Sequence, residues 1–138
     1  MKYFYPLAMV ATLLVASVTS YAADPGNNFC KEVVDSQKVF DCSVYEKARA
    51  DKELNNQYRN LLERVSSQYK SNRMLGDDYI QRIKSSQRLW IKLRDADCTL
   101  EAFQIEAGTL AYETTMNYCV VRMSDKRSRY LERIAPNL

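Results

Sequence analysis

The four cysteines are the residues of this chain with the clearest chemical potential. They are Cys30, Cys42, Cys98 and Cys119. In an oxidising compartment cysteines pair as disulfides, which give a short chain rigidity that a small core cannot supply alone. Cysteines can also bind a metal, but the chain has no histidine and no CxxC spacing. We therefore predict two disulfides, no metal site and no other cofactor.

Side chains that catalyse reactions are few. Without histidine, the chain cannot build a Ser–His, Cys–His or His–metal constellation. Oxidised cysteines are not nucleophiles. Carboxylate pairs remain, such as Asp77 with Asp78 or Glu101 with Glu106, but acidic residues near helix starts are more often caps than acid–base pairs. No glycine-rich phosphate loop occurs. The sequence therefore predicts a protein that is not an enzyme.

The N-terminal segment predicts export. Lys2 supplies a positive charge, Leu7 to Val18 is apolar but too short to span a bilayer, and Ser20-Tyr21-Ala22 places small residues where a signal peptidase cleaves. We expect residues 1–22 to be a cleaved signal peptide and residues 23–138 to form one domain in the periplasm or outside the cell. An uncleaved anchor is the alternative. The first cysteine lies several residues past the cleavage site, so we expect no lipid anchor and no membrane attachment after cleavage.

The charges argue against a nucleic-acid partner. The chain has 20 Lys and Arg against 17 Asp and Glu, a formal net charge of +3, and the two signs are interspersed. Basic residues do cluster near the C-terminus, at Arg122, Lys126, Arg127, Arg129 and Arg133. We interpret this cluster as a solvated helix face, with a phosphate-binding patch as the alternative.

Helical patterns dominate the rest of the chain. Neither glycine nor proline interrupts the segment from Ser43 to about Arg73, and apolar residues recur there at helical spacing. That apolar stripe consists of Leu54, Tyr58, Leu61, Leu62, Val65 and Tyr69. Ser43 followed by Glu46 predicts a capping box at the start of this helix. Asn72 to Asp78 predicts a turn, in which Gly76 ends the first helix and Asp77 or Asp78 caps the next.

A second helix is predicted from about Tyr79 to near Phe103. One stripe of it carries Ile83, Gln87, Trp90, Arg94 and Cys98. A third helix is expected to follow a cap at Thr114 or Thr115 and to end at Pro136. The predicted fold is all-α, a small disulfide-braced bundle with a long antiparallel hairpin and a third C-terminal helix.

The hairpin constrains the disulfides. If the chain folds back around Leu75-Gly76, Cys98 comes level with Glu53, about 15 Å along the helix from Cys42, whereas a disulfide allows about 7 Å between Cα atoms. This favours Cys30–Cys42 with Cys98–Cys119 over the crossed alternative, Cys30–Cys119 with Cys42–Cys98. A Cys30–Cys42 bond requires a break in the helix, for which Asp35-Ser36 and Asp41 are the candidates.

Two motifs carry a resemblance to a known family. One is Ala50-Asp51-Lys52-Glu53-Leu54-Asn55 with Tyr58, and the other is Gln87-Arg88-Leu89-Trp90-Ile91-Lys92-Leu93-Arg94-Asp95-Ala96-Asp97-Cys98. With their cysteine spacing, they resemble the lysozyme inhibitor LprI-like N-terminal domain family. The resemblance implies a small exported helical domain that binds and inhibits lysozyme, the enzyme that cuts bacterial cell-wall glycan. Three departures stand out: Ala107-Gly108 replaces a double glycine, Ser124 a threonine, and Ser128 an aliphatic residue.

The motif residues also have a structural explanation. Trp90 is expected to fill the hairpin core against Leu61 and Leu62. Arg94 lies on the same stripe and needs a partner, for which we hypothesise Asp51, with stacking on Tyr58 as a further contact. The full structural set is Asp51, Leu54, Asn55, Tyr58, Gln87, Trp90, Arg94 and Asp95.

The segment from Phe103 to Glu113 is the predicted partner-binding element. It is irregular, has Gly108 at its tip, and is tethered on both sides by Cys98 and Cys119. Its candidate residues are Glu101, Phe103, Glu106, Gly108, Tyr112 and Glu113. The alternative is a plain connector between helices. As to function, we predict an inhibitor of lysozyme or a related wall-degrading enzyme. The alternative is a periplasmic adaptor, accessory or immunity-type protein that binds another envelope or secreted protein.

Overall fold

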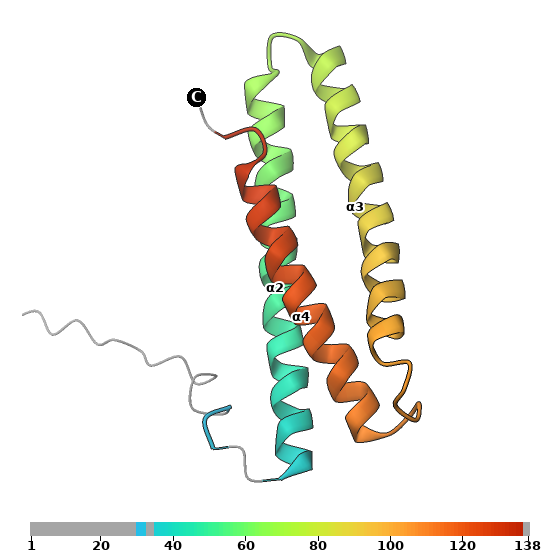
Figure 1. Ribbon diagram of the computed structural model, residues 1–138. Coiled ribbons are helices and arrows are strands. Elements are labelled where there is room, and N and C mark those ends of the chain that lie inside the picture. The colour runs from blue at the N-terminus through green and yellow to red at the C-terminus, as the bar shows by residue number, and fades with distance from the viewer. Residues whose placement is uncertain (1–29, 33–34, 137–138) are drawn as a thin grey trace, which may run out of the picture.

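The computed structural model describes residues 30–32 and 35–136. Three helices make up this part of the chain: α2 (Ser36–Gln68), α3 (Arg73–Glu101) and α4 (Leu110–Arg133). Figure 1 shows α2 and α3 as an antiparallel hairpin, with α4 running back alongside α2. The all-α prediction is confirmed. The predicted signal peptide lies outside the described residues, and none of the described helices combines the length and apolarity needed to cross a bilayer.

Both predicted disulfides are present. Cys30 bonds to Cys42 with Cα atoms 5.3 Å apart, and Cys98 bonds to Cys119 with Cα atoms 5.5 Å apart. The first bond is possible because α2 begins only after Asp35, so Cys30 lies outside the helix and can turn back toward it. The break is therefore at Asp35-Ser36, and Asp41 lies within the helix.

The start of α2 differs from the prediction. Asp35 is the N-cap, and its carboxylate accepts a hydrogen bond from the Lys38 amide at 2.8 Å. Ser43, the predicted cap, is buried inside the helix. Its hydroxyl donates to the Phe40 carbonyl at 2.6 Å and accepts from the Asn117 amide nitrogen at 3.0 Å. Ser43 is thus a hydrogen-bonded residue of the α2–α4 interface, and the capping-box prediction is wrong.

The turn between α2 and α3 is also earlier than predicted. Asn72 caps α3 by accepting from the Leu75 amide at 3.2 Å, so Asp77 and Asp78 lie within the helix. Gly76 is buried in the first turns of α3 and does not end α2. A Cβ added there would lie 2.8 Å from the Tyr69 Cβ, so glycine permits a close approach of the two helix ends.

The cap of α4 is a third correction. Thr109 is the N-cap, and its hydroxyl accepts from the Tyr112 amide at 3.2 Å. Thr114 and Thr115 lie inside the helix, where the Thr115 hydroxyl donates to the Ala111 carbonyl at 2.9 Å. The helix therefore begins at Leu110, about one and a half turns before the predicted start.

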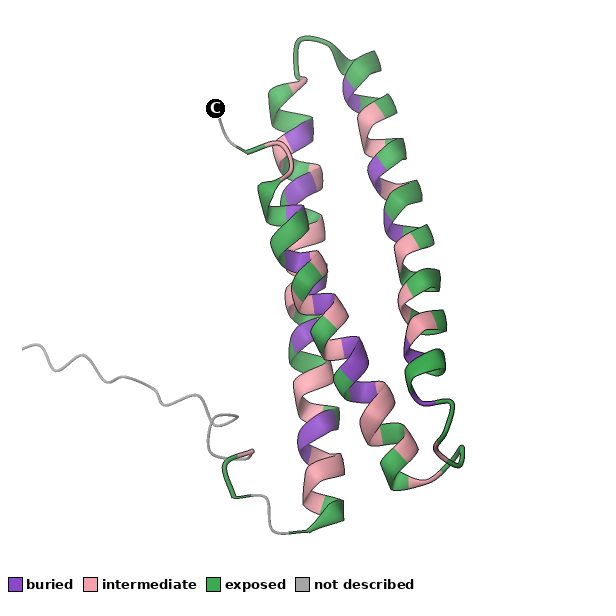
Figure 2. Ribbon diagram, in the orientation of Figure 1, coloured by how far each residue is buried: buried purple, intermediate pink, exposed green. Residues whose placement is uncertain are grey.

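The main core lies where the three helices meet. It contains Leu54, Leu61 and Val65 from α2, Ile83 from α3 and Leu131 from α4. Small buried residues let α2 and α4 pack closely along the rest of their length. They are Ser43, Ala50, Ser124 and Ser128. Helix α3 packs less extensively, and Figure 2 shows much of its surface as exposed.

Arg64 of α2 completes the end of α4. Its guanidinium donates to the carbonyls of Leu131 at 2.8 Å, Ile134 at 3.1 Å and Ala135 at 3.1 Å. The last carbonyls of a helix have no partner within the helix and carry partial negative charge. One arginine therefore caps α4 and ties its end to α2.

Candidate functional site

The connection between α3 and α4 lies at one end of the bundle and spans residues 102–109. We call it the α3–α4 loop. Its backbone is held by internal hydrogen bonds, from the Ile105 amide to the Ala102 carbonyl at 2.9 Å and from the Thr109 amide to the Glu106 carbonyl at 3.3 Å. Gly108 has φ of 81°, a left-handed conformation that favours glycine. The loop is therefore shorter and more ordered than the predicted irregular segment.

Two contacts brace the base of the loop. The Cys98–Cys119 disulfide joins α3 to α4 just below it, and both sulfurs lie 3.9 Å from the Met123 sulfur. The Arg122 guanidinium, one turn after Cys119 in α4, binds the carboxylate of Glu101, the last residue of α3, at 2.6 Å. A covalent bond and a charge-assisted hydrogen bond thus join the end of α3 to the middle of α4.

The end of α3 and the start of the loop expose two apolar side chains, with acidic residues nearby. Phe103 is 82% exposed and Leu100, at the end of α3, is 72% exposed. Glu106 and Glu113 are exposed on either side of Gly108. Of the predicted loop residues, Tyr112 and Glu113 lie in the first turn of α4, and Glu101 is the last residue of α3.

The motif residues on the hairpin form a network, as hypothesised. Arg94 lies 3.4 Å from Asp51 on α2, and it also binds the neighbouring Asp95 at 2.8 Å. Its guanidinium stacks on Trp90, with 5.5 Å to the ring centroid, whereas Tyr58 packs against the core. The contact with Asp51 joins α3 to α2, whereas the contacts with Asp95 and Trp90 lie within α3.

The other motif residues lie at the core, in a buried hydrogen bond or on the surface of α2. Leu54 belongs to the core, and Trp90 is partly buried against it as predicted. Gln87 is buried and accepts a hydrogen bond from Arg127 of α4 at 3.0 Å. Asn55 is exposed on α2.

The Arg94–Asp51 contact should show thermodynamic coupling. Because Arg94 is largely buried, removing one partner leaves the other charge poorly compensated. We expect the double variant Arg94→Met with Asp51→Leu to be more stable than the sum of the two single changes implies, by about 0.5–1 kcal/mol. Urea unfolding of the wild type, the two single variants and the double variant measures this coupling energy. Simple additivity would show that the contact does not fix the register.

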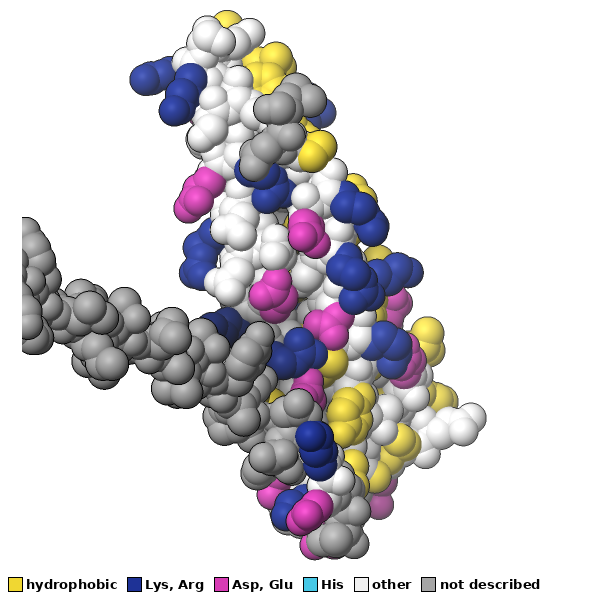
Figure 3. All heavy atoms as spheres, turned by 90° about the vertical axis from the view of Figure 1, so that its left-hand side faces the viewer, with side chains coloured by type: hydrophobic (Ala, Val, Ile, Leu, Met, Phe, Trp, Pro, Cys, Tyr) yellow, Lys and Arg dark blue, Asp and Glu magenta, His cyan; other side chains and the backbone are white. Residues whose placement is uncertain are grey.

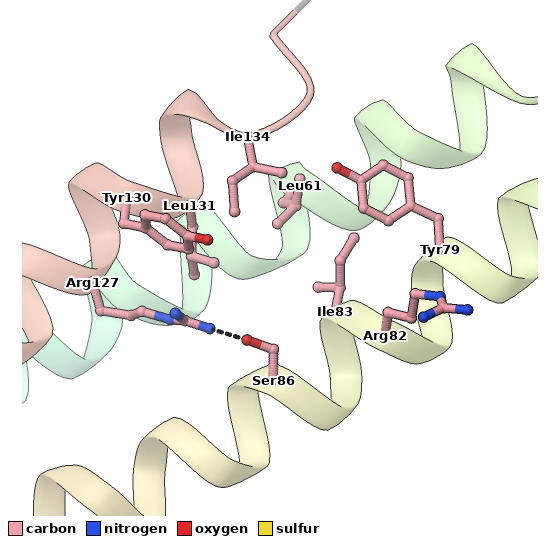
Figure 4. Close-up of a pocket in the computed structure, with 9 residues that line it drawn as sticks. All are labelled: Leu61, Tyr79, Arg82, Ile83, Ser86, Arg127, Tyr130, Leu131 and Ile134. Atoms are coloured by element: carbon pink, nitrogen blue, oxygen red, sulfur yellow. Dashed lines mark hydrogen bonds between the residues drawn. The ribbon is translucent and has the colours of Figure 1, made fainter.

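A groove between α3 and α4 was not predicted. Figure 4 shows its floor of Leu61, Ile83 and Leu131, with Tyr130 and Arg127 on the α4 side. Its volume is about 350 Å³. Arg127 crosses the groove and donates to the Ser86 hydroxyl at 3.0 Å.

Arg127 is not part of a uniformly solvated basic face. Its guanidinium lies 5.5 Å from the Trp90 ring centroid and 5.0 Å from that of Tyr130. Burial lowers the pKa of Arg127 below its usual value. The signal that could have revealed it is spacing: Val120, Ser124, Arg127 and Leu131 follow one another at steps of four, three and four. Elsewhere on α4 the charges are mixed, and Figure 3 shows both signs interspersed over the face it displays.

Comparison with known proteins decides the family. The sequence pattern of the family described as "Lysozyme inhibitor LprI" matches residues 30–131. The chain belongs to this family. A crystal structure of a DUF1311 family protein from Pseudomonas putida KT2440 superposes on this LprI-family protein with a TM-score of 0.67. The two chains are 32% identical, and the match covers 76% of this chain and 97% of the other.

The chain is also similar in sequence to a protein of a second organism. An uncharacterized protein of Rhizobium meliloti (strain 1021) is 25% identical to this LprI-family protein over 131 residues, which is 91% of each chain. The matched region of the family includes both disulfides and the whole α3–α4 loop. Among the described residues, no group of three or more potential metal ligands occurs.

Proposed function

We propose that this LprI-family protein is an exported, non-enzymatic protein that binds and inhibits a lysozyme or a related wall-degrading enzyme. The α3–α4 loop is the element that contacts the enzyme in this proposal. The observation that carries it is Phe103, which is 82% exposed where the loop leaves α3, next to a disulfide and an ion pair between α3 and α4. Two disulfides in a small domain also support an oxidising, extracytoplasmic location.

An inhibitor that covers an enzyme cleft gains affinity when its contact element is rigid before binding. Ordering a mobile loop opposes association, and the braced loop avoids most of that cost. Exposed aromatic side chains are frequent anchors of protein interfaces. Phe103 supplies the anchor.

The charges near the tip fit a cationic enzyme, as many lysozymes are. Glu106 and Glu113 are exposed beside the loop. The formal net charge of the whole chain is +3, so long-range attraction to a cationic enzyme is weak. In the proposal, affinity therefore depends on contacts made at the loop more than on electrostatic steering.

The direct test is lysis of a cell-wall suspension by chicken-type lysozyme with and without the purified protein. We expect micromolar wild-type protein to slow lysis. The Phe103→Asp variant should raise the inhibition constant by roughly 30-fold, because a hot-spot residue contributes about 2 kcal/mol.

Met74→Asp is the matched control. Met74 is 84% exposed and Phe103 is 82% exposed, but Met74 lies next to the turn at the opposite end of α3. This variant should inhibit as the wild type does. An unchanged lysis rate at micromolar wild-type protein would contradict the proposal and favour an adaptor or immunity-type role. If both variants weakened inhibition equally, the loop would not be the surface that binds the enzyme.

A further inference from the structure

Helix α3 carries a second apolar stripe that the bundle leaves exposed. It consists of Leu89, Leu93, Ala96 and Leu100, at steps of four, three and four. Leu89 is 66% exposed, Leu93 55% and Leu100 72%, and Ala96 is exposed as well. Single exposed leucines are common on protein surfaces, but this spacing is the heptad pattern of a helix that packs against another helix.

This stripe differs from the one that faces the core. The inner face of α3 holds Ile83, Trp90, Arg94 and Cys98, which contact α2 or α4. At 100° per residue, the exposed stripe lies on a different side of the helix. It ends upstream, because the preceding heptad positions are occupied by Ser86 and Arg82. Helix α3 therefore has an uncovered apolar face over its second half.

Two charged residues flank the stripe on opposite sides. Lys92 and Asp97 are five positions apart, and neither forms an ion pair within the described part of the chain. If Leu93 and Leu100 take the first position (a) of the heptad, Lys92 takes the last position (g) and Asp97 takes the fifth (e). These two positions lie on opposite sides of the apolar seam. Two parallel helices bring such residues together, each lysine facing the aspartate of the other helix. The face is thus complementary in charge to a parallel copy of itself.

We propose that this protein forms a parallel homodimer through α3, with Leu89, Leu93, Ala96 and Leu100 at the seam and two Lys92–Asp97 pairs beside it. The occupant of the exposed stripe is a second copy of the same chain. The seam covers about two heptads, so the dimer is expected to be weak and to form at micromolar or higher concentrations. A parallel arrangement places both α3–α4 loops at the same end. The proposal is independent of lysozyme inhibition.

The test is sedimentation velocity of the full-length secreted protein, with its disulfides intact, from the micromolar to the millimolar range. The wild type should shift from the mass of one chain to the mass of two. Leu93→Glu should abolish this shift. Ile91→Glu is the matched control, because Ile91 is also partly exposed on α3 but lies outside the stripe. It should leave the shift unchanged, and circular dichroism should show equal helix content in all variants.

Charge exchange tests the parallel register. Lys92→Glu alone and Asp97→Lys alone should each raise the concentration for half-dimerisation several-fold, because like charges would then face each other. Mixing the two variants should restore dimerisation. In the mixed dimer the introduced glutamate of one chain would face the introduced lysine of the other, and the remaining Asp97 would face the remaining Lys92.

Three results would overturn the proposal. One is a wild-type chain that remains single at every concentration. Another is dimerisation that Leu93→Glu leaves intact. The third is a mixture of the charge variants that associates no better than either alone, which would exclude the parallel seam. A monomeric chain whose lysozyme binding falls on Leu93→Glu would instead assign the stripe to the enzyme.

Discussion

Replacing both Cys98 and Cys119 with alanine should lower the free energy of unfolding by about 3 kcal/mol, because the lost cross-link no longer restricts the unfolded chain. The bond closes a segment with a sequence separation of 21 residues, and both cysteines are buried at the α3–α4 interface. Helix α3 packs less extensively than α2 and α4, and this bond is one of its attachments to α4. Urea unfolding without reductant gives the change.

The other disulfide provides the control. Cys30 and Cys42 are separated by 12 residues, and the bond ties a short segment to the start of α2. Without it, that segment gains freedom in the folded protein as well as in the unfolded chain, so the net loss of stability should be under about 1 kcal/mol. Equal losses from the two pairs of substitutions would contradict the view that Cys98–Cys119 holds the bundle together.

Leu61→Ala should lower the free energy of unfolding by about 3 kcal/mol, within the range of 2–5 kcal/mol for large-to-small core changes. Leu61 is fully buried in α2, and it packs in the cluster that joins all three helices. The cavity left behind would border Ile83 and Leu131, which are held by their own helices and cannot collapse fully into it.

Leu89→Ala is the matched control for Leu61→Ala. Leu89 is 66% exposed on α3, so the same substitution should change the stability of the monomer by less than about 0.5 kcal/mol. Thermal and urea unfolding at low protein concentration measure both variants. A loss of less than about 1 kcal/mol for Leu61→Ala would show that the three helices do not share one core.

The helices and the disulfides could be predicted because their signals are local or geometric. Apolar spacing identified the long hairpin, and the rise per residue of a helix ruled against the crossed disulfides. Helix starts were harder. Ser43 has the sequence context of a cap, but its hydroxyl is used by Asn117, 74 residues away, which no local pattern reveals. Gly76 likewise lets the start of α3 pass close to Tyr69 and does not end a helix.

The candidate site was predictable in part. The cysteines and Gly108 marked the α3–α4 loop, and the structure shows that Phe103 is exposed there. Arg127 was missed, because a run of basic residues in a sequence does not show which of them stacks on Trp90 and Tyr130. That distinction depends on how α3 is placed against α4, which is set by tertiary contacts.

The central claim is that the braced loop is the surface that meets the enzyme. Hydrogen exchange of the protein, alone and with a saturating amount of chicken-type lysozyme, tests it most directly. We predict slower exchange at residues 102–110, with little change at the turn between α2 and α3. Protection confined to that turn, or no protection anywhere while lysis is inhibited, would contradict the account.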